Sequence, residues 1–195
     1  MKRIHLTLVL ATVIFVAAFA SAAVANTVGK MEINAGYAKS STDFTGNDES
    51  MGGGIAFGAA YWRNASPTVQ WGAEASWDGL GSLDYTLPGP TTGTVSASVI
   101  RINPALRVNF GSKVGPSFFA QGGAGLYSMS FKDQPSGGAE AKDTQSKFGF
   151  NLGAGVGFPV GPKTNMNFLG QYHSISTDGQ STNYIEFKAG VGFGL

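Results

Sequence analysis

The stretch "FGFNLGAGVGF", residues 148–158, places an apolar side chain at every second position, with glycine or asparagine between them. This period of two is typical of a β-strand, because successive side chains of a strand point to opposite faces of the sheet. One face would carry Phe, Leu, Ala and Val, and the other would be almost bare backbone. The stretch therefore predicts a strand with one strongly apolar face, and the question is what that face contacts.

The same alternation recurs along the rest of the chain, and no useful length of sequence shows the 3.6-residue apolar period of a helix. Each alternating stretch is close to the length of about 9–11 residues that a tilted membrane-spanning strand needs. Together with residues 148–158, the following stretches make eight predicted strands: 30–38, 53–62, 68–78, 99–110, 117–131, 164–174 and 183–195.

The connections between these strands alternate in length without exception. In an up-and-down antiparallel sheet, alternate connections lie at opposite ends of the strands. The pattern therefore predicts four long loops at one end and three tight, proline-containing turns at the other. The long connections are 39–52, 79–93, 132–145 and 174–182, and the short ones are 63–67, 111–116 and 159–163.

Residues 1–25 differ from the rest of the chain. Lys2 and Arg3 precede an apolar run that ends in Ala23, Val24 and Ala25. This layout is typical of a cleavable secretory signal peptide, and a transmembrane anchor helix is the alternative. We expect cleavage, because small residues close the run and no basic flank follows it. The predicted domains are a signal peptide at 1–25 and a β-barrel domain at 26–195.

Composition narrows the class of protein further. Only 13% of the 195 residues are charged, there are 29 glycines, and cysteine is absent, which excludes a disulfide framework and a thiolate metal site. The net charge of +1 becomes −1 when the signal peptide removes two positive charges. With no basic run, the mature chain gives no electrostatic reason to expect a nucleic-acid partner.

Eight alternating strands can form a soluble barrel with its apolar face inside or a membrane barrel with that face outside. The interior of an eight-stranded barrel is only just wide enough for ordinary side chains, so the bulky apolar set fits poorly inside. The other face is rich in Gly, Ala, Ser and Asn and carries few charges, whereas a soluble outer face would carry many. The apolar face is therefore expected to contact lipid.

Aromatic residues near both ends of the strands also indicate that the apolar face contacts lipid. Two belts of aromatic rings are favoured at the two interfaces of a bilayer. The belt near the short turns is expected to contain Trp62, Trp71, Phe110, Phe118, Phe158 and Phe193, and the belt near the long loops Tyr37, Trp77, Tyr127, Phe148, Tyr172 and Tyr184.

One strand departs from the simple pattern. Pro104 lies inside the stretch 99–110 and cannot donate to a ladder, and a competing parity appears at Val95, Ala97 and Val99. We therefore expect a bulge or other register irregularity within residues 95–104.

The whole mature chain, from about residue 28 to 195, resembles a known family. The stretches that carry the likeness are "FAQGGAGLYS" (119–128), "FNLGAGVGF" (150–158), "MNFLGQYHSIS" (166–176) and "IEFKAGVGFGL" (185–195). They resemble the OmpA/OmpX-like superfamily of small bacterial outer-membrane β-barrels, and most nearly its porin-like outer membrane protein β-barrel domain family. The resemblance implies an all-β fold, an eight-stranded antiparallel transmembrane β-barrel in the outer membrane of a Gram-negative bacterium.

The few ionisable residues on the polar face form the candidate site. Because a buried charge without a partner is too costly to keep, we expect these residues to pair inside the barrel as a structural lumen cluster. They are Glu32, Glu74, Arg101, Arg107, His173, Glu186 and Lys188.

His173 is the one residue that suggests catalysis. It is expected opposite Glu186, with Ser174 and Ser176 nearby in sequence, and such a set resembles a hydrolytic triad. Outer-membrane lipid A deacylases resemble this architecture, but they place His and Ser two residues apart on one face, and here that position is Ile175. The expected role of His173 is a structural pair with Glu186, with no catalytic residue, cofactor or metal site.

The favoured function is that of a structural or interaction protein, not an enzyme. The barrel would lie in outer-membrane lipid as a monomer and display four loops to an extracellular protein or host ligand, for adhesion, envelope integrity or host interaction. A narrow porin-like pore is the main alternative, and a lipid-modifying hydrolase and a soluble ligand carrier are remoter ones. The acidic residues of the long loops are expected to be solvated.

Overall fold

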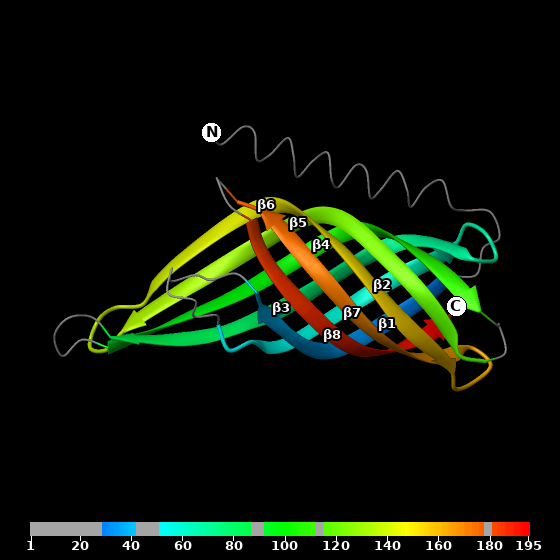
Figure 1. Cartoon of the computed structure of the whole chain (residues 1–195), viewed down its shortest axis with the longest axis horizontal. Coiled ribbons are helices and arrows are strands. Elements are labelled where there is room, and N and C mark those ends of the chain that lie inside the picture. The colour runs from blue at the N-terminus through cyan, green and yellow to red at the C-terminus, as the bar shows by residue number, and fades with distance from the viewer. Residues whose placement is uncertain (1–28, 42–50, 87–91, 112–114, 178–180) are drawn as a thin grey trace.

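The computed structural model describes residues 29–41, 51–86, 92–111, 115–177 and 181–195, and the expected signal peptide lies outside these ranges. Among these residues no helix is long and apolar enough to cross a membrane. Each strand pairs antiparallel with the next, and the last pairs with the first, which confirms the predicted closed eight-stranded barrel (Figure 1). The strands are β1 Gly29–Ser40, β2 Gly54–Asn64, β3 Val69–Thr86, β4 Thr92–Gly111, β5 Ser117–Pro135, β6 Ala141–Pro159, β7 Thr164–Ser176 and β8 Ser181–Gly194.

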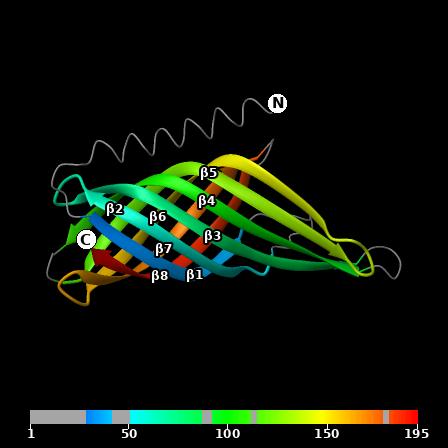
Figure 2. The ribbon, with the colours of Figure 1, turned by 180° about the vertical axis from the view of Figure 1, so that it is seen from behind.

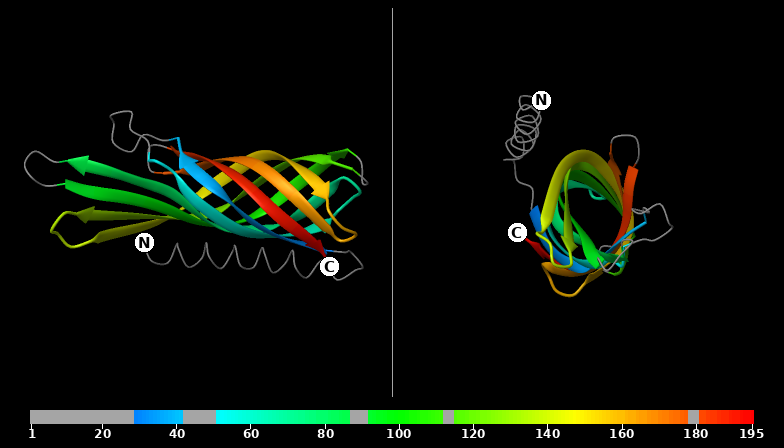
Figure 3. Two further views of the ribbon diagram at one scale, coloured as in Figure 1. Left: turned by 90° about the horizontal axis from the view of Figure 1, so that it is seen from below. Right: turned by 90° about the vertical axis from the view of Figure 1, so that its left-hand side faces the viewer.

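Pairing of β1 with β8 completes the ring, with Ile33 opposite Val191. Viewed along the axis, the strands form a closed ring, and the tilt of the strands is clear from the side (Figure 3). Closure matters because a strand edge left open inside a bilayer would expose backbone N–H and C=O groups to hydrocarbon. Within the spanning part of the barrel, every strand therefore has a partner on both sides.

The apolar face points outward, as predicted. On β8 the side chain of Phe187 is 65% exposed, whereas its neighbour Glu186 is fully buried. On β6 the same contrast separates Leu152, which is exposed, from Asn151, which is buried. The alternation read in the opening stretch is thus an alternation between lipid and the barrel interior.

The two aromatic belts are present, but three of the expected members are not in them. Trp62, Tyr127 and Tyr184 are fully buried in the interior. Trp62 faces the gap left by Ala60 and Ala105, which are too small to fill the interior at that level. The two tyrosines point inward because their hydroxyl groups find polar partners there. Belt members on the outer surface include Tyr37, Trp77, Phe148 and Tyr172 at one end and Phe110, Phe118, Phe158 and Phe193 at the other.

The strands β3–β6 are much longer than predicted, at 18, 20, 19 and 19 residues. Stretches 79–93 and 132–145 were expected to be loops, but residues 79–86, 92–93, 132–135 and 141–145 belong to these strands. The four strands continue past the barrel rim as one sheet, which projects at the left in Figure 1 and at the right in the reverse view of Figure 2. We call this part, residues 79–86, 92–99, 128–135 and 141–147, the projecting sheet. The short turns lie at the opposite end of the molecule.

Where the sheet leaves the barrel, the outer face of these strands changes from apolar to polar and the inner face changes from polar to apolar. On β4 the outward residues change from Ile102 and Ile100 to Ser98 and Ser96, while the inward residues change from Arg101 to apolar Val99 and Ala97. Geometric parity does not change along β4. The face that meets hydrocarbon within the membrane meets water beyond it, so hydroxyl groups replace apolar side chains there.

This exchange explains the competing parity seen in residues 95–99, and the predicted irregularity within 95–104 of β4 is wrong in its position. The register shifts instead on the partner strand, between Gly79 and Gly81 of β3, opposite Ser98 and Ala97. Gly81 has a φ of +93°, a conformation that glycine adopts without strain, and the extra residue is Leu80. Pro104 causes no shift, because β4 and β5 keep one register on either side of it.

Single-cysteine spin labels on β4 test the exchange of faces, and the chain offers a cysteine-free background. A label at Ile102 is expected to be accessible to oxygen dissolved in lipid, whereas labels at Ser98 and Ser96, on the same face, should be accessible to a water-soluble nickel chelate. Lipid accessibility at all three positions would contradict the assignment of the membrane boundary.

Close approach of β1 to β8 gives a second test. A Cβ added to Gly36 would lie 1.9 Å from the backbone oxygen of Phe187, and backbone cannot yield as a flexible side chain does. Gly36→Ala should lower the free energy of unfolding by about 2 kcal/mol or prevent folding. Urea unfolding measures this, with Gly161→Ala as the control, since a Cβ there meets only ordinary contacts at 3.6 Å. Equal midpoints for the two variants would contradict the tight β1–β8 contact.

Candidate functional site

Arg101 lies at the centre of the barrel interior and is 1% exposed. Its Nε is 3.2 Å from Asp78 Oδ2 and its Nη2 is 3.0 Å from Glu186 Oε2, while Glu74 Oε2 lies 3.7 Å from Nη1. Lys188 adds a second cation, with Nζ 3.0 Å from Glu186 Oε2. One guanidinium thus serves three carboxylates, and its planar set of donors suits that role.

Arg107 forms a second centre nearer the short turns. It pairs with Glu32 through both terminal nitrogens, at 2.9 and 3.2 Å. Its guanidinium lies between the rings of Trp62 and Phe119, 4.2 and 4.3 Å from their centroids. Cation–π contacts of this kind are favourable where water is excluded. Arg107 is therefore fixed by charge on its edge and by aromatic rings against its planar faces.

Gln121 connects the two centres. It accepts a hydrogen bond from Arg107 Nε at 2.9 Å and donates one to Glu74 Oε1 at 2.6 Å. The chain of contacts therefore runs without a break from Glu32 to Arg107, through Gln121 and Glu74, and on to Arg101. The interior of the barrel is crossed by one connected polar network.

His173 belongs to the far end of this network. Its Nε2 is 3.2 Å from Glu186 Oε2, so the expected pair of these two side chains is present. The expected register is wrong, because the residue directly opposite His173 on β8 is Tyr184 and Glu186 lies on the diagonal. The imidazole stacks on Tyr184 at 4.2 Å with an interplanar angle of 4°. Ser174 and Ser176 alternate to the outer face of β7 and do not approach the imidazole. The described residues of this hairpin do not have the geometry of a hydrolytic triad.

The structure places all seven sequence-predicted site residues in the barrel interior: Glu32, Glu74, Arg101, Arg107, His173, Glu186 and Lys188. Several members were not predicted. Asp78 pairs with Arg101 and accepts a hydrogen bond from Tyr184 at 2.7 Å, and Lys30 lies 3.3 Å from Glu32. The signal for both was available, because Asp78 has the parity of Glu74 on β3 and Lys30 has the parity of Glu32 on β1.

An apolar cluster closes the interior above the charged network. It brings Met51 and Leu80 together with Val99, Met129 and Ile175, and all of them are at most 2% exposed. Tyr127 and Tyr184 lie between this cluster and the charges, with their rings in the cluster and their hydroxyls toward His173 and Asp78. The interior is thus plugged by an apolar layer at the end of the projecting sheet and by the Trp62–Arg107–Phe119 stack at the other end.

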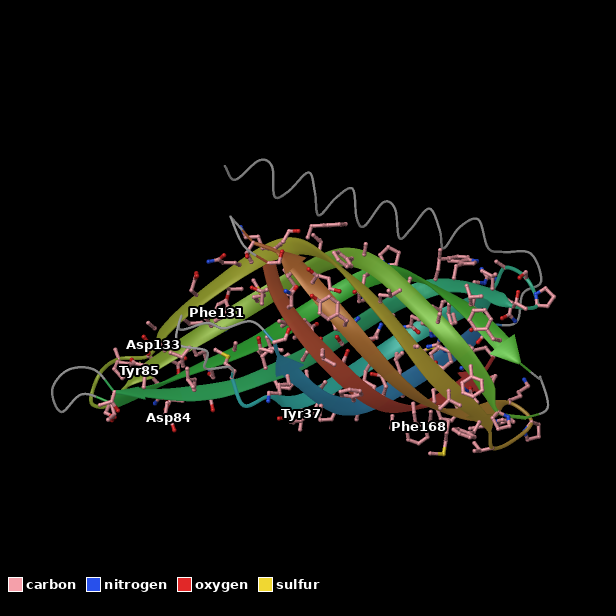
Figure 4. The ribbon with its side chains drawn as sticks, in the orientation of Figure 1. Tyr37, Asp84, Tyr85, Phe131, Asp133 and Phe168 are labelled. Atoms are coloured by element: carbon pink, nitrogen blue, oxygen red, sulfur yellow. The ribbon has the colours of Figure 1, made fainter. Side chains whose placement is uncertain are left out.

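The inner face of the projecting sheet continues this apolar cluster outward. Leu83, Val95 and Phe131 are partly buried against it. Farther out, Tyr85 Oη donates a hydrogen bond to Asp133 Oδ1 at 2.7 Å, and this bond raises the pKa of the Tyr85 phenol. Figure 4 shows Tyr85, Phe131 and Asp133 on the projecting sheet, well away from Tyr37 and Phe168 on the barrel wall.

The projecting sheet has two lateral edges beyond the barrel rim. The β2–β3 ladder ends at the pair Ala56 and Asp78, and the β6–β7 ladder ends at Gly149 and Ile175. Among the described residues, 83–86 of β3 and 141–146 of β6 pair on one side only. The N–H and C=O groups on the other side of such a strand are available to another chain.

Within the described ranges no group of three or more His, Asp or Glu residues is arranged to hold a metal ion. Asp143 is engaged by Gln145 at 2.9 Å and Glu140 by Lys132 at 3.4 Å. The acidic residues expected in the first long loop, 42–50, lie outside the described residues.

A closed antiparallel barrel with an apolar outer belt, aromatic rings at both margins and paired charges inside defines a transmembrane β-barrel of the outer-membrane type. The chain belongs to the outer membrane protein beta-barrel domain family, whose model matches residues 6–194. It is therefore a bacterial outer-membrane protein, in contact with the lipid of that membrane.

Solved structures share this fold at low sequence identity. Neisserial surface protein A (NspA) is 16% identical, with a TM-score of 0.57 over 86% of this chain and 97% of that one. A major outer membrane protein from Thermus thermophilus is 10% identical, with a TM-score of 0.54 over 86% and 99%. Ail, the attachment invasion locus protein of Yersinia pestis, is 18% identical, with a TM-score of 0.49 over 86% and 99%. No protein with a curated description matches the chain by sequence.

Replacing the central guanidinium tests the network. Arg101→Met should destabilise the barrel by about 3–5 kcal/mol, because it leaves three buried carboxylates without their shared cation. Urea unfolding of the folded barrel measures the loss, with exposed Lys163→Gln as the control for removing one positive charge. Unchanged stability of the Met variant would show that the carboxylates do not depend on Arg101.

Proposed function

We propose that this protein is a monomeric interaction protein of the outer membrane, which uses the barrel as an anchor and the projecting sheet as its binding element. The observation that carries this proposal is the continuation of four paired strands beyond the rim. A paired sheet holds its side chains in fixed positions, so a partner can bind it at a lower entropic cost than it would bind free loops.

The features of the projecting sheet suit a polypeptide partner outside the cell. Its inner face offers Leu83, Val95 and Phe131 beside the polar pair Tyr85 and Asp133. Its lateral edges can accept a further strand through backbone hydrogen bonds, a common mode of peptide recognition. Because all edges inside the bilayer are paired, the barrel itself needs no second copy for closure.

The alternative functions have less support from the described residues. A pore requires a continuous aqueous path, and the interior is filled by the ionic network between the Trp62–Arg107–Phe119 stack and the apolar cluster. A hydrolase requires a nucleophile beside His173, and the contacts of that imidazole are with Tyr127, Tyr184 and Glu186. We assign neither activity to this chain.

Electrical recording tests the choice between anchor and pore. Purified protein reconstituted into planar bilayers is expected to give no steady, resolved openings, because the described side chains fill the interior between the Trp62–Arg107–Phe119 stack and the apolar cluster. A reproducible unitary conductance that changes with Arg107→Ala would contradict the proposal and favour the porin-like alternative.

Surface display tests the binding role. Bacteria displaying the protein should bind at least one immobilised extracellular-matrix or serum protein, and Leu83→Asn with Val95→Asn should reduce that binding by about tenfold or more through loss of apolar contact. Ser82→Asn with Ser96→Asn is the matched control, since these residues adjoin the first pair but lie on the opposite face. Equal loss in both variants, with both barrels folded, would contradict binding by the inner face.

A further inference from the structure

The outer face of the projecting sheet carries an ordered array of hydroxyl groups. On β4 the outward residues beyond Ile100 are all Ser or Thr, and the neighbouring strands place Ser or Thr beside most of them. We call these residues the hydroxyl array: Ser82, Thr86, Thr92, Thr94, Ser96, Ser98, Ser128, Ser130, Thr144 and Ser146.

Neighbouring hydroxyls of the array contact one another. Ser130 Oγ lies 3.0 Å from Thr144 Oγ1, and Ser146 Oγ donates to Ser128 Oγ at 3.4 Å. A hydroxyl has one donor and two acceptor positions, so each member of such a pair retains capacity for a ligand. Array residues on neighbouring strands are about 4.8 Å apart, and successive array residues on one strand are about 6.8 Å apart. The array is therefore a regular grid of donors and acceptors.

The array is continuous with the lipid-facing surface of the barrel. On β4, Ile102 and Ile100 lead directly to Ser98, and on β6, Phe150 and Phe148 lead directly to Ser146, with no change of face. A surface that meets acyl chains below this line meets the headgroups attached to those chains above it. The rows of the array next to the apolar belt therefore lie at the level of the headgroups of the outer leaflet.

Two cations lie in the same grid. Lys132 and Lys142 are directly opposite each other on β5 and β6, and both fall in the row of Ser82 and Ser96. Lys132 is half-exposed and forms an exposed ion pair with Glu140 at 3.4 Å. Exposed ion pairs contribute little free energy, so the Lys132 ammonium group can still bind a phosphate. Asp84 also lies on this face and accepts a hydrogen bond from Thr94 at 2.7 Å.

We propose that the hydroxyl array, with Lys132 and Lys142, binds the phosphorylated sugar headgroups of outer-leaflet glycolipid. Sugar hydroxyls both donate and accept, as do Ser and Thr, and phosphate groups attract the two ammonium groups. Going outward from the apolar belt, the row of Ser98, Ser130 and Thr144 comes first and the row that holds the two lysines follows. This matches an order of acyl chain, sugar and phosphate. The projecting sheet, which continues along the barrel axis (Figure 1), would have its outer face beside the glycolipid headgroups and its inner face turned away from them.

This inference rests on the membrane placement of the barrel and does not require the proposed polypeptide partner. The two can fail separately, because one concerns the outer face of the projecting sheet and the other its inner face and edges. Failure of the display assay would leave the glycolipid contact intact, and the reverse also holds.

Binding to defined lipids tests the proposal with the folded, detergent-solubilised mature protein. Fluorescent rough lipopolysaccharide, which carries a phosphorylated core oligosaccharide, is titrated beside lipid A without core sugars and beside phosphatidylglycerol. We expect the tightest binding to the rough lipopolysaccharide. Lys132→Gln with Lys142→Gln should weaken that binding about tenfold, and Ser98→Ala with Ser130→Ala and Thr144→Ala should weaken it several-fold, because charge-assisted hydrogen bonds are the stronger ones.

The control removes the same charge from other faces of the protein. Lys147→Gln with Lys163→Gln takes one cation from the inner face of β6 and one from a short turn, and binding should stay near that of the parent protein. A heat-induced shift in gel mobility verifies folding of each variant. Equal losses in the lysine pair and the control, equal losses for phosphatidylglycerol, or no preference for the core sugars would each overturn the proposal.

Discussion

A polypeptide that crosses hydrocarbon must satisfy every backbone N–H and C=O group from its own chain, and a sheet can do this only by closing on itself. Pairing of β1 with β8 meets that requirement here. Closure then determines where each side chain lies, because a ring of alternating strands has one face toward lipid and one toward a narrow interior. Bulky side chains go outward, and the interior is left to small, polar and ionic residues.

The interior of the barrel is filled mainly by ionic and polar side chains. Eight strands enclose a space that side chains must fill. Here they fill it with charges, and each charge is matched: three carboxylates share Arg101, and Glu32 is held by Arg107 and Lys30. Removal of one partner from such a set costs far more than the intact pair contributes, because it leaves a buried charge without its counter-charge. The apolar cluster and the Trp62–Arg107–Phe119 stack then seal its two ends.

Beyond the rim the same strands meet a different solvent, and their chemistry is reversed. The apolar side chains of residues 95–99 turn inward to form the cluster, while hydroxyl groups and lysines take the outer face. The projecting sheet is thus a small two-faced sheet held on a rigid base. Its outer face adjoins the headgroups, and its inner face and edges lie outside the membrane, so one structural element can meet lipid and partner at once.

The sequence alone was enough to predict the barrel and the alternation of connections, because a period of two identifies each strand. It also indicated the outward direction of the apolar face, because bulky side chains do not fit a narrow interior and the other face carries few charges. It also named ionisable residues that the structure finds in the interior, since parity assigns each one to a face. Parity assigned Trp62, Tyr127 and Tyr184 inward as well, but their aromatic character suggested the belts, and only the packed interior shows that their rings fill space beside Arg107, His173 and Asp78.

Tertiary structure alone decided how far the strands continue and where the register shifts. Stretches 79–93 and 132–145 are rich in Gly, Pro and polar residues and read locally as loops. Pairing among four neighbouring strands nevertheless keeps residues 79–86, 92–93, 132–135 and 141–145 extended. The bulge at Leu80 depends on which strand can supply a glycine with positive φ opposite Ala97. Both outcomes depend on contacts with a neighbouring strand, and the local sequence pattern of one strand does not show which residues that neighbour places opposite it.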